Sequence, residues 1–221
     1  MSFENRTDAG RQLARRLDAL EPERPVVVGM ARGGVPVAKE VASRLGAPLD
    51  VLVVRKVGAP FHPEYAIGAV ARGVLRLDER AIALLAVPRA EVDAIVATET
   101  ETLERREALY RSGRPAVDVR GRTVVLVDDG LATGMSARAA IAALRACGPG
   151  RVVFGSPVCA RDSADALRGV ADDVICAVTP RTFRAVGQWY RDFAPTTDAE
   201  VIAILQEAAG TDAATSAGKQ P

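Results

Sequence analysis

The sequence predicts an α/β protein whose core is a doubly wound, five-stranded parallel sheet. Short apolar runs, typical of strands buried on both faces, alternate with segments whose apolar residues recur at helical spacing. A hydrophobic content of 48% with only 4% aromatic residues suits such a sheet when helices rich in Ala and Val pack on it. We expect a single domain over residues 1–209, with strands at residues 25–30, 48–54, 123–128, 151–157 and 173–178.

The first strand follows a helix and leads into a turn that is suited to bind an anion. Leucines on one face predict the helix at residues 7–20. The strand is followed by Arg32, Gly33 and Gly34, and then by a second helix. An Arg-Gly-Gly turn between a strand and a helix offers a cation and free backbone N–H groups to an anion. Paired glycines also mark ordinary turns, so the alternative stays open.

The second strand ends at two cations, Arg55 and Lys56. Because ligands of open α/β sheets gather at the carboxyl ends of the strands, this pair is placed to face phosphate groups. A solvated basic pair is the alternative. Residues 57–64 contain glycine and proline and are expected to form a mobile loop. This loop carries His62, the chain's one histidine, whose role stays open between a solvated and a catalytic side chain.

A long stretch between the second and third strands lies outside the predicted parallel sheet. Residues 65–77 alternate loosely between apolar and polar side chains and fit a two-stranded ribbon. Residues 78–114 predict a helical insertion, in which a helix at residues 90–111 alternates charge on its outer face. The insertion is a candidate subunit contact in a homodimer, and a solvated face is the alternative. The inner stripe of the long helix is expected to contain Val92, Val96, Leu103 and Tyr110.

The third strand leads into the most informative motif of the chain. Its apolar run is followed by Asp128 and Asp129, and then by a turn that contains Thr133, Gly134 and Ser136. Free backbone N–H groups at a helix start, with hydroxyls beside them, are suited to bind phosphate. The two carboxylates suit the vicinal hydroxyls of a ribose, or its metal. The motif therefore predicts a ribose 5-phosphate ligand, with a merely solvated Asp pair as the alternative.

The C-terminal part carries aromatic residues outside the sheet. The segment at residues 180–195 contains Trp189 and Tyr190, whose flat rings suit stacking on a nucleobase. Rings that pin this segment to the core are the alternative. A capping box at residues 197–200 opens a last helix that we expect to end near residue 207. The tail at residues 210–221 is polar and small, and we expect it to be disordered.

Charge, cysteines and hydropathy exclude several classes of protein. The net charge is +1, so no bulk field attracts the protein to nucleic acid or to a membrane. No apolar run reaches the roughly 18 residues of a membrane span, and the N-terminus has no apolar signal core. Cys147, Cys159 and Cys176 lie apart and form no CxxC pair. We therefore expect buried free thiols in a reducing, cytoplasmic setting.

The stretch TVVLVDDGLATGMS, residues 123–136, resembles the phosphoribosyl-pyrophosphate (PRPP) signature of type I phosphoribosyltransferases. Ala-Arg-Gly-Gly at residues 31–34, followed by Val-Val-Arg-Lys at residues 53–56, looks most like the adenine branch of that family. The motif has neither the GxxxxGK[ST] spacing of a Walker loop nor the GxGxxG spacing of a dinucleotide site. The resemblance covers roughly residues 25–180.

The resemblance implies transfer of the 5-phosphoribosyl group from PRPP to a nitrogen of a nucleobase-like acceptor. Pyrophosphate is released, Mg²⁺ is the cofactor, and nucleotide salvage is the setting; the metal's ligands stay unidentified. Asp128 and Asp129 would act on the ribose, residues 57–66 would close over the site, and residues 180–195 would form a hood over the base. The 5-phosphate would be held by Ala132, Thr133, Gly134, Met135 and Ser136. The pyrophosphate would be held by Arg32, Gly33, Gly34, Arg55 and Lys56.

Two positions depart from the family pattern. Met135 stands where the signature usually has a second glycine, although its backbone N–H can still donate. Ala132 stands where hypoxanthine–guanine enzymes carry an aspartate, which favours a base without a 6-oxo group. A second function also stays open, that of a regulator that senses PRPP or a nucleotide on the same fold without turnover. Acids and cations retained at all three loops favour the transferase.

Overall fold

The sheet has seven strands, two more than predicted, and the additional pair is antiparallel. In this computed structural model, which describes residues 2–217, the strand order is β4-β3-β2-β1-β5-β6-β7. The five expected strands pair in parallel, which confirms the α/β fold. They are β1 (Val26–Ala31), β2 (Leu49–Ala59), β5 (Thr123–Val127), β6 (Arg151–Val158) and β7 (Asp173–Val178).

The additional strands are β3 (His62–Ala71) and β4 (Val74–Leu77), which extend the sheet beyond β2. Their presence confirms the ribbon predicted at residues 65–77. It also shows that the mobile loop predicted at residues 57–64 was wrong, because most of this stretch pairs between β2 and β3. Gly58 permits the pairing, since a Cβ there would lie 2.3 Å from a backbone oxygen of β3.

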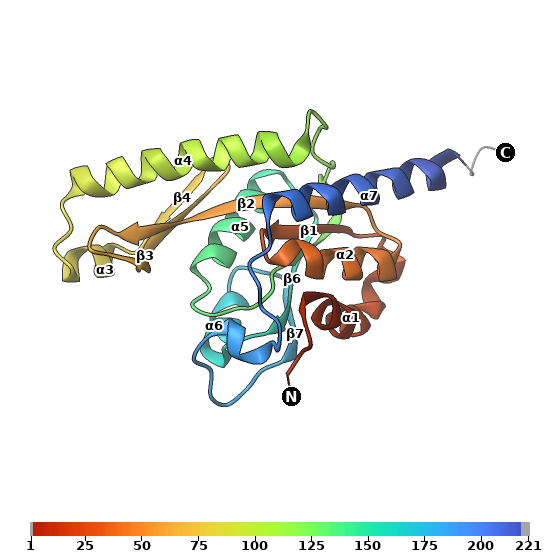
Figure 1. Cartoon of the computed structure of the whole chain (residues 1–221), viewed down its shortest axis with the longest axis horizontal. Helices are drawn as coiled ribbons and strands as arrows, with labels where there is room; N and C mark the ends of the chain where they lie inside the picture. The colour runs from red at the N-terminus through yellow and green to blue at the C-terminus, as the bar shows by residue number, and fades with distance from the viewer. Residues whose placement is uncertain (1, 218–221) are drawn as a thin grey trace.

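Helices cover both faces of the parallel part (Figure 1). One face packs against α1 (Arg6–Arg16), α2 (Gly34–Leu45) and α7 (Asp198–Ala217). The other packs against α5 (Met135–Ala146) and α6 (Arg161–Leu167). Each face of the sheet has its own hydrophobic core. Alternate residues of β5 belong to one core or the other, because successive side chains of a strand point to opposite faces. The short 3₁₀ helices η1 (Asp18–Glu23) and η2 (Val186–Trp189) lie in the connections.

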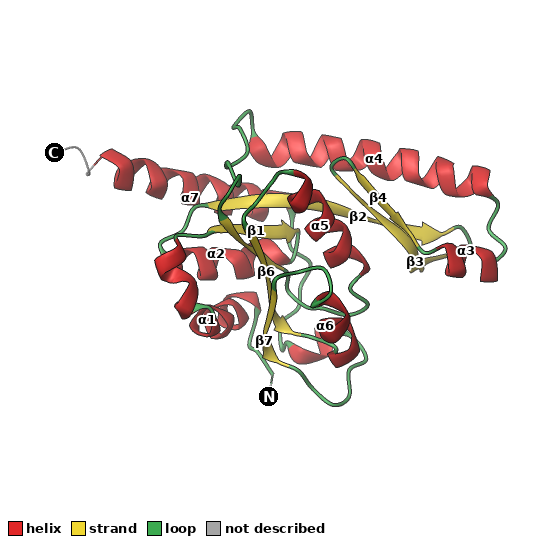
Figure 2. Ribbon diagram, turned by 180° about the vertical axis from the view of Figure 1, so that it is seen from behind, coloured by secondary structure: helices red, strands yellow, loops and turns green. Residues whose placement is uncertain are grey.

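The helical insertion consists of α3 (Glu79–Leu84) and α4 (Arg89–Arg111) and is packed along the sheet. Figures 1 and 2 show α4 running beside β2, β3 and β4, with the β3–β4 hairpin and α3 extending away from the parallel strands. Leu103 and Tyr110 are buried in the core of α2 and α7, and Val92 is buried against the β2–β3 hairpin. Val96 is partly buried in the same contact. The predicted inner stripe is therefore correct.

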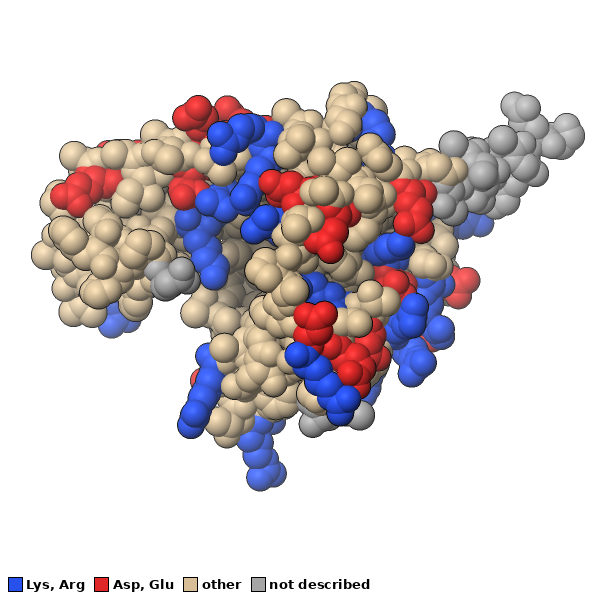
Figure 3. Space-filling model, in the orientation of Figure 1, with Lys and Arg blue, Asp and Glu red and all other residues tan. Residues whose placement is uncertain are grey.

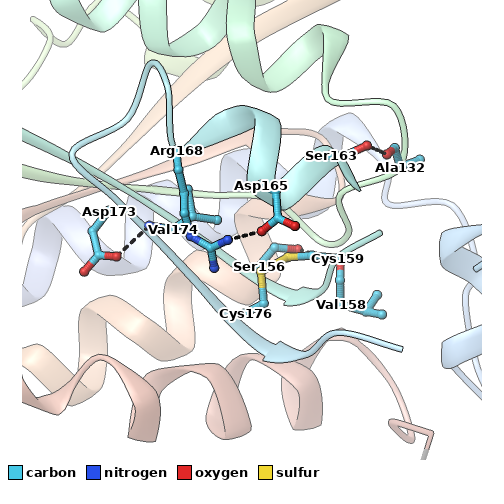
Figure 4. Close-up of a disulfide and its surroundings, with 10 residues drawn as sticks. All are labelled: Ala132, Ser156, Val158, Cys159, Ser163, Asp165, Arg168, Asp173, Val174 and Cys176. Carbon is cyan, nitrogen blue, oxygen red and sulfur yellow. Dashed lines mark hydrogen bonds and ion pairs between the residues drawn. A yellow bond between two sulfur atoms is a disulfide. The ribbon is translucent and has the colours of Figure 1, made fainter. Parts of the chain in front are cut away.

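A disulfide joins Cys159 and Cys176, where free thiols were predicted. Cys159 follows β6 and Cys176 lies in β7, and the pairing of these neighbouring strands brings the two Cα atoms to 6.1 Å (Figure 4). Spacing in the sequence does not reveal this register, so the prediction was wrong for this pair. Cys147 is free, but it is exposed rather than buried.

The last helix is longer than predicted. α7 passes residue 207, where we expected it to end, and continues to Ala217. The tail predicted to be disordered from Gly210 is thus helical as far as Ala217, and residues 218–221 lie outside the described residues. Within residues 2–217, no helix combines the length and the hydropathy that crossing a membrane requires.

Candidate functional site

The predicted phosphate turn lies between β5 and α5. Gly134 has a φ of +77°, a left-handed conformation that residues with a side chain rarely adopt, and α5 begins at the next residue. No side chain of the described residues caps α5, so its first backbone N–H groups are available to an anion. Thr133 and Ser136 line the cavity in front of this helix start.

The phosphate turn is held in place by β6 and α6. The backbone N–H of Leu131 donates to the carbonyl oxygen of Val158 at 2.8 Å, and the carbonyl oxygen of Leu131 accepts from the N–H of Ala160 at 2.8 Å. On α6, the hydroxyl of Ser163 donates to the carbonyl oxygen of Ala132 (Figure 4). These bonds fix the backbone of the turn from the side that carries the disulfide.

The two predicted carboxylates lie at the end of β5 and are largely buried. The backbone N–H of Asp129 donates to Oδ1 of Asp128 at 2.9 Å. Burial, and then the charge of Asp129, raise the pKa of Asp128 to about 8, against the lowering effect of Lys56 and Arg6. Burial also raises the pKa of Asp129, although Arg6 opposes this shift. Both pKa shifts therefore favour the protonated carboxyl, and burial is their main cause.

The Arg-Gly-Gly turn packs directly against these carboxylates. A Cβ on Gly33 would lie 2.0 Å from Oδ2 of Asp129, and a Cβ on Gly34 would lie 2.5 Å from the carbonyl oxygen of Val127. Neither position has room for a side chain, because Gly33 meets the carboxylate of Asp129 and Gly34 meets the backbone at the end of β5. The turns after β1 and β5, which are far apart in the sequence, thus pack against each other, although neither Gly33 nor Gly34 lines the cavity described below.

The predicted cations lie differently with respect to the site. Arg55 and Lys56 lie within β2 rather than at its end, because β2 continues past its parallel part and pairs there with β3; both line the cavity, and Lys56 is exposed. Nε of Arg55 donates to Oε2 of Glu99 at 2.6 Å. Arg32 does not line the cavity, and its side chain is directed to α7, where a guanidinium nitrogen lies 3.7 Å from Oδ1 of Asp198.

The cavity that joins these groups has a volume of about 960 Å³. It is lined by the ends of β1 and β2, the β2–β3 hairpin, the β5–α5 turn, α4 and the segment after β7. Figure 3 shows the molecule hollowed between the hairpin arm and the body, with acidic and basic side chains interspersed on this face. All five residues predicted to hold the 5-phosphate line the cavity: Ala132, Thr133, Gly134, Met135 and Ser136.

The predicted stacking rings lie in a hydrophobic cluster. Tyr190 is buried, packs against Phe3 and Phe193, and donates its hydroxyl to the carbonyl oxygen of Asp129 at 2.6 Å. Trp189 is partly buried in the same cluster. Neither ring lines the cavity, whereas Phe193 does. This placement favours the alternative in which the rings pin the segment to the core.

Arg6 binds the carboxylate pair without lining the cavity, and the sequence did not reveal this role. Its Nε and one terminal nitrogen each lie 2.9 Å from Oδ2 of Asp129, and its other terminal nitrogen donates to the carbonyl oxygen of Ala194 at 2.7 Å. The guanidinium also lies 4.1 Å above the ring of Phe193. Arg6 thus joins α1, the carboxylate pair and the segment after β7. No local pattern in α1 distinguishes it from the other arginines there.

The comparisons with known proteins identify a family for this chain. Residues 3–190 match the phosphoribosyl transferase domain family. Two Mycobacterium tuberculosis proteins, whose names assign them provisionally to the phosphoribosyl transferases, are 47% identical to this chain over 207 residues. The alignment covers 93% of this chain and 47% of each relative, so the chain spans about half the length of the curated relatives it matches.

Solved structures show the same fold. The crystal structure of TT1426 from Thermus thermophilus is 45% identical, with a TM-score of 0.77, and the match covers 94% of this chain and 99% of that one. A hypothetical protein from Neisseria gonorrhoeae, solved with bound ppGpp, is 11% identical with a TM-score of 0.51, over 94% and 98% of the two chains. The second likeness concerns the fold alone. Because the family match spans β1 to β7 and the turns that form the site, this chain belongs to the phosphoribosyl transferase domain family.

Proposed function

We propose that the chain is a phosphoribosyltransferase that binds PRPP with Mg²⁺ and transfers its 5-phosphoribosyl group to a nitrogen of a nucleobase-like acceptor. The observation that carries this proposal is the single cavity into which the start of α5, the carboxylates of Asp128 and Asp129, and the cations Arg55 and Lys56 all open. Displacement of pyrophosphate needs a phosphate anchor, negative charge near the sugar and positive charge near the leaving group. The cavity holds all three.

The start of α5 serves as the anchor. A 5-phosphate bound by its backbone N–H groups and by Ser136 would hold C1 of the ribose in front of the carboxylates, so that binding of a non-reacting group positions the reacting centre. Positive charge develops on the sugar as the bond to pyrophosphate breaks, as it does in glycoside hydrolysis. Asp128 and Asp129 stabilise this charge and accept hydrogen bonds from the ribose hydroxyls. Arg55 and Lys56 neutralise the leaving pyrophosphate.

The donor set fits a Mg²⁺ ion that is shared with the substrate. Over residues 2–217, no group of three His, Cys, Asp or Glu side chains is arranged to hold a metal, and Arg6 already binds Asp129. The protein would therefore hold the ion through Asp128. Mg²⁺ in proteins commonly uses one or two carboxylates and takes its other oxygens from substrate phosphates and water. When bound, it would supply positive charge at the pyrophosphate.

We propose adenine, or another base without a 6-oxo group, as the acceptor. Ala132 lies in the cavity and offers no carboxylate to a 6-oxopurine. The cavity of about 960 Å³ is large enough for a sugar phosphate and a base, since ligand pockets commonly measure about 300–1,000 Å³.

The proposal is tested by measuring pyrophosphate release from PRPP and Mg²⁺ in the presence of adenine, hypoxanthine, guanine or uracil. We expect the highest kcat/KM with adenine. A preference for guanine would contradict the argument from Ala132 but leave the transferase intact. PRPP binding without release in the presence of any base would instead favour a PRPP-sensing regulator.

A further inference from the structure

The inserted helix α4 contributes carboxylates to the cavity wall. Glu91 and Glu99 both line the cavity that the β5–α5 turn also lines. Glu99 accepts the 2.6 Å hydrogen bond from Nε of Arg55, and this pair is only partly exposed, with 29% of the Arg55 side chain and 21% of the Glu99 side chain accessible. The contact occupies a guanidinium that, under the proposed function, faces pyrophosphate.

The second arginine predicted for pyrophosphate is held in a similar way. Asp198, at the start of α7, lies near Arg32 and also accepts a 2.5 Å hydrogen bond from the hydroxyl of Tyr110, which belongs to α4. The two arginines predicted to hold pyrophosphate are therefore each paired with a carboxylate from a helix. Asp198 of α7 pairs with Arg32, and Glu99 of α4 pairs with Arg55. Lys56, by contrast, has no ion-pair partner within 4 Å among the residues that the structure describes.

We propose that Glu99 is an internal competitor of pyrophosphate, which holds Arg55 and must release it when the pyrophosphate group of PRPP binds. This inference rests on the proposed function and specifies how the same site is regulated. A carboxylate and a phosphate bind a guanidinium through the same N–H groups, so each excludes the other from those donors. Glu99 thereby weakens the binding of PRPP and of product pyrophosphate, and it favours release of the product.

The variant that tests this is Glu99→Gln. Glutamine is nearly isosteric and its amide oxygen can still accept a hydrogen bond from Arg55, so the guanidinium keeps a partner while the negative charge is removed. Because the Arg55–Glu99 pair is partly exposed, removing its competition should raise the affinity for pyrophosphate by about two- to fivefold. Removal of a negative charge close to pyrophosphate adds to this effect. We therefore expect pyrophosphate to bind roughly two- to tenfold more tightly to the variant.

The matched control is Glu101→Gln, which makes the same change on the same helix. Glu101 is exposed and does not line the cavity. Pyrophosphate and ribose 5-phosphate are each titrated calorimetrically into the wild-type protein and both variants, with Mg²⁺ present. Ribose 5-phosphate binds at the start of α5 under the proposed function, so Glu99→Gln should leave its affinity unchanged. The gain for pyrophosphate should diminish with added salt, because the removed interaction is electrostatic.

The outcomes separate the inference from the function on which it rests. The inference is supported if the Glu99 variant binds pyrophosphate more tightly than the wild type, with unchanged affinity for ribose 5-phosphate, and the Glu101 variant shows no such gain. Unchanged or weaker pyrophosphate binding in that variant overturns it, and weaker binding would mean that Glu99 orients Arg55 for the ligand. An equal gain in the Glu101 variant also overturns it, because the effect would then belong to overall charge. A wild-type protein that binds neither ligand refutes the proposed function itself.

Discussion

Replacement of Arg6 by methionine should destabilise the protein in a pH-dependent manner. Methionine retains an apolar stem against Phe193 but removes the cation that binds Oδ2 of Asp129 through two nitrogens at 2.9 Å. Asp129 would then lie unpaired beside Asp128 in a largely buried position. Removal of one partner of a buried ion pair typically costs about 3–5 kcal/mol. Because 13% and 15% of the two side chains are exposed, we expect a screened loss of about 2–3 kcal/mol at pH 8.

The pH dependence follows from the raised pKa values. The pKa of Asp128 is about 8 in the folded protein, against an ordinary value of 3.8, and that of Asp129 is also raised. As the pH rises, the unfolded chain loses these protons before the folded protein does. The stability that the two carboxyls contribute below about pH 4 is therefore lost progressively towards pH 8. Arg6 lowers both folded pKa values and limits this loss. The stability lost on replacing Arg6 by methionine should therefore be largest at pH 8 and smallest at pH 5.

The assay is urea denaturation of the wild-type and variant proteins at pH 5, 6.5 and 8. Arg11→Met is the control, because Arg11 belongs to the same helix and pairs with Glu40 at 3.0 Å while 66% of its side chain is exposed. Exposed pairs of this kind contribute at most about 1 kcal/mol. A loss for Arg6→Met that is independent of pH, or largest at pH 5, would refute the reasoning. So would a loss at pH 8 no larger than that of the control.

Two further substitutions test the packing around the site. Gly33→Ala should lower stability by about 1–3 kcal/mol and reduce pyrophosphate release, because the added Cβ would lie 2.0 Å from the carboxylate of Asp129. Gly169→Ala, with its nearest neighbour at 3.6 Å, is the control in thermal unfolding, and equal effects would contradict the clash. Cys176→Ser opens the disulfide, which links residues 17 positions apart, and should cost about 3 kcal/mol. Reduction of the wild type with dithiothreitol should cause the same loss of stability, whereas Cys147→Ser should cause none. If dithiothreitol leaves the stability of the wild type unchanged, this prediction is contradicted.

Features encoded in short segments could be predicted from the sequence. The apolar run of β5 identifies a buried strand, and Asp128, Asp129 and the small-residue turn follow it without interruption. The long helix of the insertion was also recognisable, because Leu103 and Tyr110 lie at helical spacing on its buried face. In each case the residues that decide the structure are neighbours along the chain, so their pattern is visible before the chain folds.

Features that depend on distant contacts could not be predicted. Arg6 reaches Asp129 across 123 residues, and nothing in α1 marks it for that role. The disulfide depends on the register of β6 and β7, and the pairing of residues 57–64 depends on Gly58 meeting β3. Tyr190 could equally have faced a ligand or the core, since a tyrosine ring suits both. Only the folded structure, in which Tyr190 packs against Phe3 and Phe193, shows that its ring lies in the core.

A crystal structure with PRPP and Mg²⁺ tests most directly whether the two turns and the carboxylates form one PRPP site. We expect the 5-phosphate at the start of α5, within hydrogen-bond distance of the backbone N–H groups of residues 134–136 and of the Ser136 hydroxyl. The ribose should lie against Asp128, and the pyrophosphate should lie near Lys56, with Arg55 released from Glu99. An ordered PRPP molecule bound elsewhere, with the start of α5 unoccupied at saturating ligand, would contradict the account.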